Sequence, residues 1–274
     1  NMPEWSMVNS IDQSPHDPAT AYLAATRYKL DDFKPYLYKT TNYGKSWKLI
    51  TSGIEKDAFT RVVREDPTRK GLLYAGTETG LYISFDDGKN WQPFQLNLPV
   101  VPVTDLLVKK NDLVVATQGR SFWILDDLTP LYQLSGKVAS AKTHLFYPRD
   151  TYRLPGDGGW GGPSPNSGAN PPNGVMTFFT LSEELGEDGE FTLEYLESDG
   201  DVIKTFTNKK DEKSSDPTAE TKKGMNRFVW NMRYPDAKKV PGAVMWGGTH
   251  IGPKAVPGEY QVRMTVNGKS QTQS

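Results

Sequence analysis

Carboxylates are the residues of this chain with the widest range of possible chemistry. Hydrolysis of a glycosidic bond needs two of them facing each other across a cleft, one as the acid and the other as base or nucleophile. Five aspartates are candidates by residue type alone: Asp66, Asp105, Asp112, Asp126 and Asp127. Their spacing identifies no pair, so the sequence leaves the catalytic residues unassigned.

Arginine offers a second chemistry, because a guanidinium group can bind a carboxylate through two parallel hydrogen bonds. Arg61, Arg64 and Arg120 fall on or beside predicted strands. Arg120 lies between two predicted strands of the last of three sequence repeats, which are described below. If these repeats are blades around a central channel, the loop that carries Arg120 could face that channel. The candidates for a channel or loop site are Arg120, Trp123, Asp126 and Asp127. A structural ion pair from Arg120 to one of these aspartates is the alternative.

Several other chemistries lack the residues they need. The chain has no Cys, which excludes disulfides and thiolate metal sites, and its three His are far apart in sequence. No nucleophile motif Gly-x-Ser-x-Gly and no phosphate-binding Gly-x-x-x-x-Gly-Lys-Ser/Thr occurs. Two Asp-Gly stretches could attract calcium, but hairpin turns explain both. We therefore expect no metal site and no cofactor.

Composition points to a β-rich protein of one or two domains. The chain has 274 residues, with 25 Gly and 20 Pro to supply turns. A formal net charge of -1 gives no electrostatic reason to bind nucleic acid or an anionic membrane. No apolar run reaches the ~18 residues needed to cross a bilayer. We expect neither a nucleic-acid partner nor a membrane span.

Two octets organise the first half of the chain. Both read Ser/Thr-x-Asp/Asn-x-Gly-x-x-Trp, and they begin at residues 40 and 84, 44 residues apart. That spacing fits the roughly 40–45-residue period of a four-stranded propeller blade. The octet predicts a hairpin turn followed by a Trp that packs on the blade, rather than a substrate contact. The residues assigned to this structural role are Thr40, Asn42, Gly44, Trp47, Ser84, Asp86, Gly88 and Trp91.

Flanking segments repeat with the octets. Residues 21–24 align with residues 72–75, and a third copy aligns residues 113–117 with residues 72–76, although its octet has decayed at residues 125–130. We predict three four-stranded blades within residues 1–135, at about 6–50, 58–96 and 102–135. A ring needs typically four to eight blades. The remaining blades, or another copy of the chain, are therefore expected as partners.

The second half of the chain differs in pattern. Residues 136–174 read as a linker with a Gly/Pro-rich run from residue 155, where Trp160 could contact a ligand or, more simply, fix the linker to a neighbouring domain. Residues 175–274 hold six or seven alternating segments with hairpin turns at Asp199-Gly200 and Asn267-Gly268. This number and spacing of strands predict an immunoglobulin-like β-sandwich.

These motifs carry a family resemblance over nearly the whole chain. The octets resemble the Asp-box of sialidase-type and sortilin-type propellers. The segment of residues 117–131 resembles the closing blade of secreted bacterial sortilin-like proteins with BNR (Asp-box) repeats, which are often labelled glycosyl hydrolases. Gly-x-Asn-x-Phe-x-Trp at residues 224–230 and Pro-Gly-x-Tyr at residues 257–260 resemble the Ig-like domain of the flagellar hook-capping type.

The resemblance implies a function as well as a fold. Such proteins are exported, so we expect an extracellular, periplasmic or cell-surface location, with the export signal outside this sequence. It implies a non-catalytic fragment of an Asp-box propeller protein that binds protein or glycan and takes part in domain assembly. The alternative is a glycoside hydrolase of sialidase or xyloglucanase type whose active site needs further blades. The paired Asp residues of the xyloglucanases match no position here, and family members are longer in both directions.

Overall fold

The structure is a computed structural model that describes residues 2–154, 168–186, 188–212, 214–238, 242 and 246–274. The chain forms two compact units, residues 1–128 and 129–274. Every strand pair in the described residues is antiparallel, so the protein is all-β apart from a few short helical turns. No helix in these ranges is long and apolar enough to span a membrane. Trp160 lies outside the described residues.

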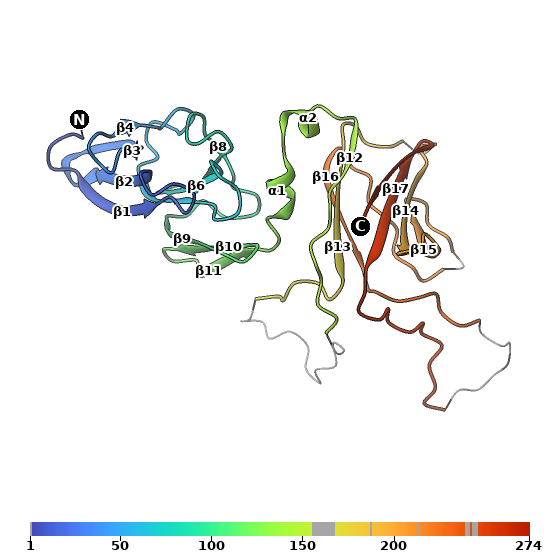
Figure 1. Ribbon diagram of the computed structural model, residues 1–274. Helices are drawn as coiled ribbons and strands as arrows, with labels where there is room; N and C mark the ends of the chain where they lie inside the picture. The colour runs from blue at the N-terminus through green and yellow to red at the C-terminus, as the bar shows by residue number, and fades with distance from the viewer. Residues whose placement is uncertain (1, 155–167, 187, 213, 239–241, 243–245) are drawn as a thin grey trace. The chain divides into compact units, whose positions relative to one another are not determined.

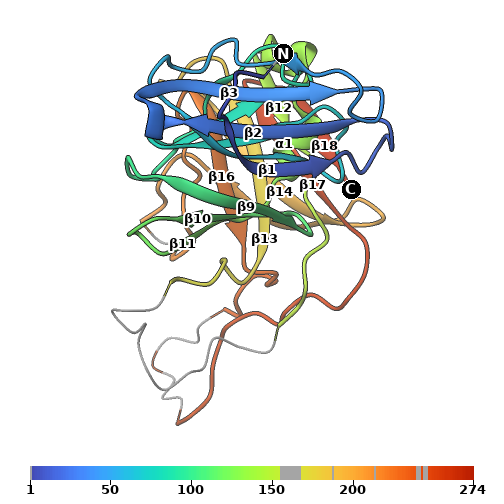
Figure 2. The ribbon, with the colours of Figure 1, turned by 90° about the vertical axis from the view of Figure 1, so that its left-hand side faces the viewer.

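The first unit contains three sheets in which consecutive strands are neighbours. The first two sheets have four strands each and the third has three (Figure 1). Figure 2 shows β1, β2 and β3 of the first sheet side by side. The strands are β1 (Met7–Gln13), β2 (Ala21–Arg27), β3 (Asp32–Thr40), β4 (Lys48–Leu49), β5 (Thr60–Glu65), β6 (Leu73–Thr77), β7 (Leu81–Ser84), β8 (Gln92–Pro93), β9 (Val103–Lys109), β10 (Asp112–Thr117) and β11 (Phe122–Leu125); the 3-10 turn η1 (Tyr28–Leu30) precedes β3.

The pairing register corrects the alignment of the repeats by one residue. Ala21 pairs with Thr40, and Leu73 pairs with Ser84 at the same octet position, so Ala21 corresponds to Leu73 rather than to residue 72. In the third sheet Leu113 pairs with Leu125, which shifts that alignment in the same way. β6 is buried on both faces, so its apolar residues do not reveal the register. A slip of one residue moves every side chain to the opposite face.

The third sheet departs from the prediction of three four-stranded blades. Its order is β11-β10-β9, without a fourth strand. The decayed octet explains the difference, because it lacks the Gly and Trp of the other two and continues instead into α1 (Thr129–Gln133). Asp127 takes a left-handed conformation with φ 66 at the point where the chain leaves the sheet.

The second unit is a two-sheet sandwich. One sheet has the order β12-β13-β16 and the other β15-β14-β17-β18, and the two face each other in Figure 1. The short helices α1 and α2 (Gly136–Ala139) precede the first strand. The strands are β12 (Thr143–Leu145), β13 (Val175–Leu181), β14 (Phe191–Glu197), β15 (Val202–Thr207), β16 (Gly224–Trp230), β17 (Tyr260–Val266) and β18 (Lys269–Gln273).

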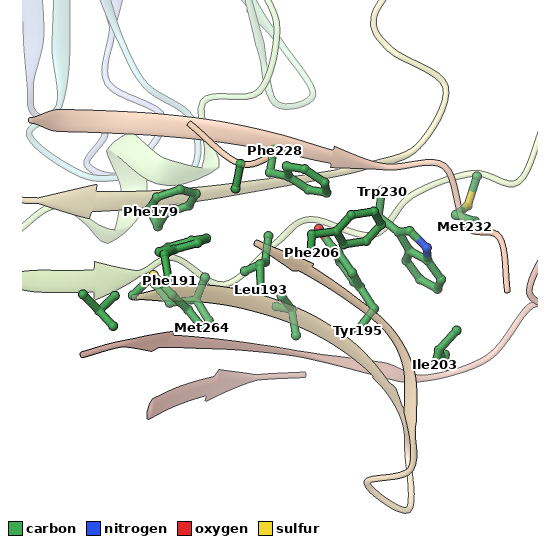
Figure 3. Packing of buried hydrophobic residues seen from close by; sticks show 14 of the residues in the cluster. Phe179, Phe191, Leu193, Tyr195, Ile203, Phe206, Phe228, Trp230, Met232 and Met264 are labelled. Carbon is green, nitrogen blue, oxygen red and sulfur yellow. The ribbon is translucent and has the colours of Figure 1, made fainter. Parts of the chain in front are cut away.

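Aromatic side chains from both sheets fill the core of the sandwich (Figure 3). The rings of Tyr195 and Trp230 stack with their centroids 4.5 Å apart, and those of Phe179 and Phe191 lie 4.9 Å apart. The Tyr195 hydroxyl is 2.8 Å from the Thr177 hydroxyl, so a buried polar pair sits inside an apolar core. Burial raises the pKa of Tyr195 well above its usual value, which keeps the phenol protonated.

Two glutamines join the edge strands of the opposing sheets. The Gln271 side chain accepts from the Leu145 amide at 2.9 Å and donates to the Thr143 carbonyl at 3.0 Å. Gln273 donates to the Leu145 carbonyl at 3.0 Å. These side chains satisfy backbone groups of β12 that a neighbouring strand would otherwise pair, so they protect an exposed sheet edge.

The buried hydroxyl pair gives a test of the sandwich core. We expect Tyr195→Phe to lower the free energy of unfolding by about 1–3 kcal/mol, because it leaves the Thr177 hydroxyl buried without its partner. The double variant Tyr195→Phe/Thr177→Val should recover most of that loss, since both polar groups are then absent. Urea denaturation of the full chain measures both values. A double variant less stable than the single one would contradict this account.

Candidate functional site

The two octets form the same hydrogen-bonded turn. Asp86 Oδ1 accepts from the Asn90 amide at 2.8 Å and from Ser84 Oγ at 2.9 Å, and Ser84 Oγ accepts from the Gly88 amide at 3.0 Å. In the first octet Asn42 Oδ1 accepts from the Ser46 amide and Thr40 Oγ1 from the Gly44 amide, each at 3.0 Å. Hydrogen bonds from Asn90 and Ser84 outweigh the effect of burial and lower the pKa of Asp86.

The two octet tryptophans differ in burial. Trp91 is buried between the first two sheets, and its indole nitrogen donates to the Ile50 carbonyl at 2.7 Å. Trp47 is only half-buried and packs against an apolar cluster on the outer face of the first sheet. The octet residues thus contribute turns and packing in both sheets, with Trp47 less enclosed than its counterpart.

Asp87, which the sequence did not single out, links the second octet to the first sheet. Tyr22 donates its hydroxyl to Asp87 Oδ1 at 2.6 Å, and Lys39 forms an ion pair with the other carboxylate oxygen. Burial and the hydrogen bond to Asp87 raise the pKa of Tyr22 far above its usual value. The carboxylate is therefore engaged in holding two sheets together.

Arg64 joins the first strands of all three sheets. Its guanidinium contacts Asp105 Oδ1 at 2.7 Å and Asp12 Oδ1 at 3.8 Å, and it donates to Ser10 Oγ at 3.1 Å and to the Leu106 carbonyl at 3.0 Å. Asp12 and Ser10 come from β1, Arg64 from β5 and Asp105 from β9. The sequence search named Arg64 and Asp105 but missed Asp12 and Ser10, because no local motif marks a contact between distant strands.

Asp12 is the more unusual carboxylate of this group. Burial raises its pKa, although the hydrogen bond from the Glu65 amide and the charge of Arg64 act in the opposite direction. Asp105 on the other side of Arg64 is largely exposed. The structure therefore brings together one half-buried and one exposed carboxylate, both in contact with the same guanidinium.

The other predicted aspartates are at least half-buried, and two of them accept hydrogen bonds from backbone amides. Asp66 is fully buried and accepts from the Thr68 and Arg69 amides at 2.8 and 2.9 Å. Asp112 accepts from the Asp127 amide at 2.9 Å, while Asp126 is half-buried and Asp127 buried beside it. Neither of the two clefts described below is lined by any of the five aspartates proposed from the sequence.

The predicted loop residues lie between β10 and β11. Arg120 is exposed, and its carbonyl accepts from the indole nitrogen of half-buried Trp123 at 2.9 Å. A structural ion pair from Arg120 to Asp126 or Asp127 stays a prediction.

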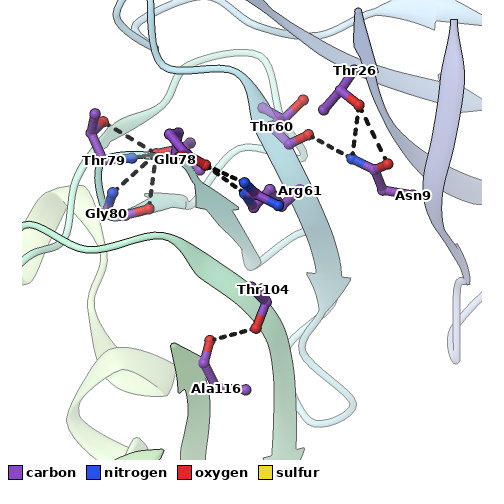
Figure 4. Close-up of polar contacts among 10 residues, drawn as sticks. Asn9, Thr26, Thr60, Arg61, Glu78, Thr79, Gly80, Thr104 and Ala116 are labelled. Atoms are coloured by element: carbon purple, nitrogen blue, oxygen red, sulfur yellow. Dashed lines mark hydrogen bonds and ion pairs between the residues drawn. The ribbon is translucent and has the colours of Figure 1, made fainter. Parts of the chain in front are cut away.

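An aromatic and charged cluster lies where the second sheet begins. Arg61 Nε donates to Glu78 Oε2 at 2.6 Å (Figure 4), and its guanidinium lies 5.3 Å from the centre of the Phe59 ring. Tyr28, from the extra loop of the first repeat, stacks on Phe59 at 5.1 Å. Figure 4 also shows Asn9, which bridges the first two sheets through Thr26 Oγ1 and the Thr60 carbonyl, both at 3.3 Å.

The sandwich carries a cleft that is lined by residues of its core. It has a volume of about 610 Å3, and Trp230 and Tyr195 of the core lie among its lining residues. Tyr147 and Tyr152 also line it and are 48% and 80% exposed. The charged residues in its lining are Arg149, Asp150, Arg153 and Glu259. Sequence reasoning missed this site, because its residues come from a segment without regular structure and from the ends of β16 and β17.

Histidines contribute little to either unit. His16 Nε2 lies 2.8 Å from the Asp66 carbonyl, and His144 packs edge-on against Phe146 at 4.7 Å. Burial lowers the pKa of His144. His250 lines a second cleft of about 480 Å3 beside the Lys204–Asp216 ion pair. Among the described residues, no three His, Asp or Glu side chains are grouped to hold a metal ion.

Comparison with known proteins gives structural neighbours but no family. No family model matches the chain, and no curated protein matches it. A solved structure of YCF48 bound to a D1 peptide is 19% identical and covers 44% of this chain and 37% of that one, with a TM-score of 0.33. The GH74 xyloglucanase from Xanthomonas campestris is 15% identical, covering 52% and 25%, with a TM-score of 0.35.

A third neighbour is YCF48 from Cyanidioschyzon merolae, which is 12% identical and covers 77% of this chain and 59% of that one, with a TM-score of 0.33. The chain thus spans less than two thirds of the length of each of these three structures. The function therefore has to be inferred from the chain's own side chains.

The glycines of the two octets provide a matched pair for testing the turn. Both have φ +78, where a side chain is strained, so each Gly→Ala change should cost about 1–2 kcal/mol. A Cβ at Gly88 would also come within 2.6 Å of Ile50 Cδ1, whereas at Gly44 the nearest atom is 3.8 Å away. We expect Gly88→Ala to cost about 1–2 kcal/mol more than Gly44→Ala in urea denaturation. Equal losses would contradict the close packing at Gly88.

Two Asp→Asn variants should change the pH dependence of stability in opposite directions. The folded-state pKa of Asp12 is above its usual 3.8, so its ionisation destabilises the fold as pH rises through that pKa. Wild type should therefore lose stability relative to Asp12→Asn as pH rises from about 3.8 through the raised pKa. The pKa of Asp86 is below 3.8, so wild type should lose stability relative to Asp86→Asn only as pH falls below that value.

Urea denaturation at several pH values measures both differences. The first octet already carries Asn42 in the position of Asp86 with an equivalent bond to the backbone, so Asp86→Asn should preserve the turn. If both variants changed the slope of stability against pH in the same direction, the assignment of a partly desolvated Asp12 and a hydrogen-bonded Asp86 would be contradicted.

Proposed function

We propose that this chain is a non-catalytic part of an exported or cell-surface Asp-box propeller protein, where it serves in domain assembly and binds a glycan or protein ligand. The observation that carries the proposal is the engagement of the acidic groups in the first unit. Asp66, Asp86 and Asp87 are held in turns or between sheets, and Arg64 holds Asp12 and Asp105. Side chains fixed in this way build sheets and are poorly placed to act on a substrate.

The repeated sheets support the propeller assignment. In each four-stranded sheet an octet turn with the same hydrogen bonds joins the third strand to the fourth, and the first strands of the three sheets meet at Arg64. In a propeller, the first strands of the blades would surround the central channel. The strand orders β12-β13-β16 and β15-β14-β17-β18 support an Ig-like sandwich, in which strands alternate between two facing antiparallel sheets.

The cleft of the second unit is the binding site that we assign to this function. Exposed tyrosines can stack on the apolar face of a sugar ring, and Arg, Asp and Glu side chains can hydrogen-bond its hydroxyl groups. Tyr147, Tyr152 and Arg153 lie in one segment of its lining, and Glu259 contributes from just before β17. Its volume of about 610 Å3 lies within the usual range for a small-molecule site. This lining favours a glycan over an extended peptide.

One observation favours the alternative of a glycoside hydrolase. Asp12 has a raised pKa, as a general acid requires, and exposed Asp105 lies on the other side of Arg64. Arg64 forms an ion pair with each of them and would have to give up these contacts before a substrate could lie between the two carboxylates. For that reason we retain hydrolysis only as the second candidate.

The proposal predicts binding without turnover. On a glycan array the full chain should bind at least one class of glycan, and Tyr152→Ala should weaken that binding by about tenfold or more, because it removes an exposed aromatic surface. Phe33→Ala, which removes another exposed ring in the first unit, is the matched control and should bind like wild type.

A hydrolysis screen on the bound glycans separates the two candidates. The wild-type chain should release no product. Hydrolysis that is lost in both Asp12→Asn and Asp105→Asn would favour the glycoside hydrolase and overturn the proposal. Absence of binding to every glycan on the array, with a bound peptide instead, would move the assignment of the cleft from glycan to protein.

A further inference from the structure

The first and second sheets show how sheets of this kind pack together. In the second sheet Val63 pairs with Ala75, which pairs with Tyr82, so these three side chains form a row on one face. The row and Trp91 are buried against the first sheet. The first sheet contributes Tyr22, Ala24 and Leu37 to the same cluster. These two faces form one interface. We call the face of the second sheet that carries Val63, Ala75 and Tyr82 the receiving face, and the face of the first sheet that carries Tyr22, Ala24 and Leu37 the inserting face.

The outer face of the first sheet is equivalent to the receiving face. Ile11 pairs with Leu23, Leu23 with Tyr38 and Tyr38 with Leu49, which makes a row across all four strands. By strand register and octet position, Ile11, Leu23 and Tyr38 correspond to Val63, Ala75 and Tyr82, and Trp47 corresponds to Trp91. Ile11 is 63% exposed and Leu49 48% exposed, so the ends of this row are open.

The outer face of the third sheet is equivalent to the inserting face. Ala116 pairs with Phe122, in the positions that Ala24 and Leu37 occupy in the first sheet. Beside them, Leu107 pairs with Val114 and Val114 with Ile124 on the same face. Phe122 is 76% exposed and Ile124 59% exposed. Large apolar side chains gathered on one sheet face are typical of an interaction surface.

We propose that the inserting face of the third sheet packs on the receiving face of the first sheet of a second copy, head to tail. The inference rests on the propeller assignment above and adds the identity of the partner and the residues of the contact. A second copy fits because the two outer faces, each with exposed apolar side chains, correspond to the two halves of an interface that already exists inside the chain. A heterologous contact of this kind closes into a ring if the rotation between copies allows it, and otherwise continues as a filament.

The contact predicts a specific pattern of association for the full chain in sedimentation velocity. Wild type at micromolar concentration should sediment above the monomer mass. Phe122→Glu and Ile11→Glu should each weaken association by about 100-fold, because each buries a charge in the apolar contact. Leu30→Glu, at an apolar residue that is 50% exposed and lies outside both faces, should associate like wild type.

Mixing the two interface variants tests the head-to-tail geometry. Each variant keeps one intact face, and the two intact faces are complementary, so an equimolar mixture should form 1:1 dimers that grow no further. Ile124→Glu serves in place of Phe122→Glu if circular dichroism shows that the latter is unfolded. Monomeric wild type at tens of micromolar, or a mixture that stays monomeric, would overturn the proposal.

The same samples separate this inference from the proposed function. Glycan binding depends on the cleft of the second unit, so the monomeric variants should bind glycans like wild type. Wild type that binds glycans but does not associate would leave the function standing and overturn the contact. Wild type that associates but binds no glycan would support the contact and overturn glycan binding as the function.

Discussion

The first unit depends on apolar side chains that project from both faces of each sheet. A sheet that is apolar on both faces is stable only if another layer covers each face. The second sheet meets this condition, because every residue of β6 and β7 is buried. Its two neighbours each cover one of its faces, and each keeps an outer face where large apolar side chains remain exposed. Packing between sheets therefore decides both the order inside the unit and the surfaces that it offers to partners.

The polar residues of the first unit serve the same packing. Asp87, Arg64 and Asn9 each connect strands of different sheets, and the octet aspartate fixes the turn that places Trp91 between two of them. A buried carboxylate is tolerated in such a place because a cation or several hydrogen-bond donors compensate its desolvation. The second unit is the better candidate for ligand binding, because its cleft combines exposed tyrosines with charged side chains.

Much of the strand pattern could be predicted from the sequence, because turns and alternation are local properties. The octets predicted the hairpins and their Gly residues. The alignment of residues 21–24 with residues 72–75 was wrong by one residue, since strands buried on both faces lack the alternation that would fix it. The third sheet lost its fourth strand where the octet had decayed. Contacts such as Asp12 with Arg64 join strands far apart in sequence, and no local signal reports them.

Hydrogen exchange tests the central claim most directly, because it measures how well each strand is covered. In a dilute, monomeric sample the amides of β6 should exchange more slowly than those of β2 and β10, which belong to the sheets with one open face. Raising the concentration should slow exchange in β2 and β10 and leave β6 unchanged. Equal protection of the three strands in the monomer, with no dependence on concentration, would contradict the view that the outer sheets need a partner.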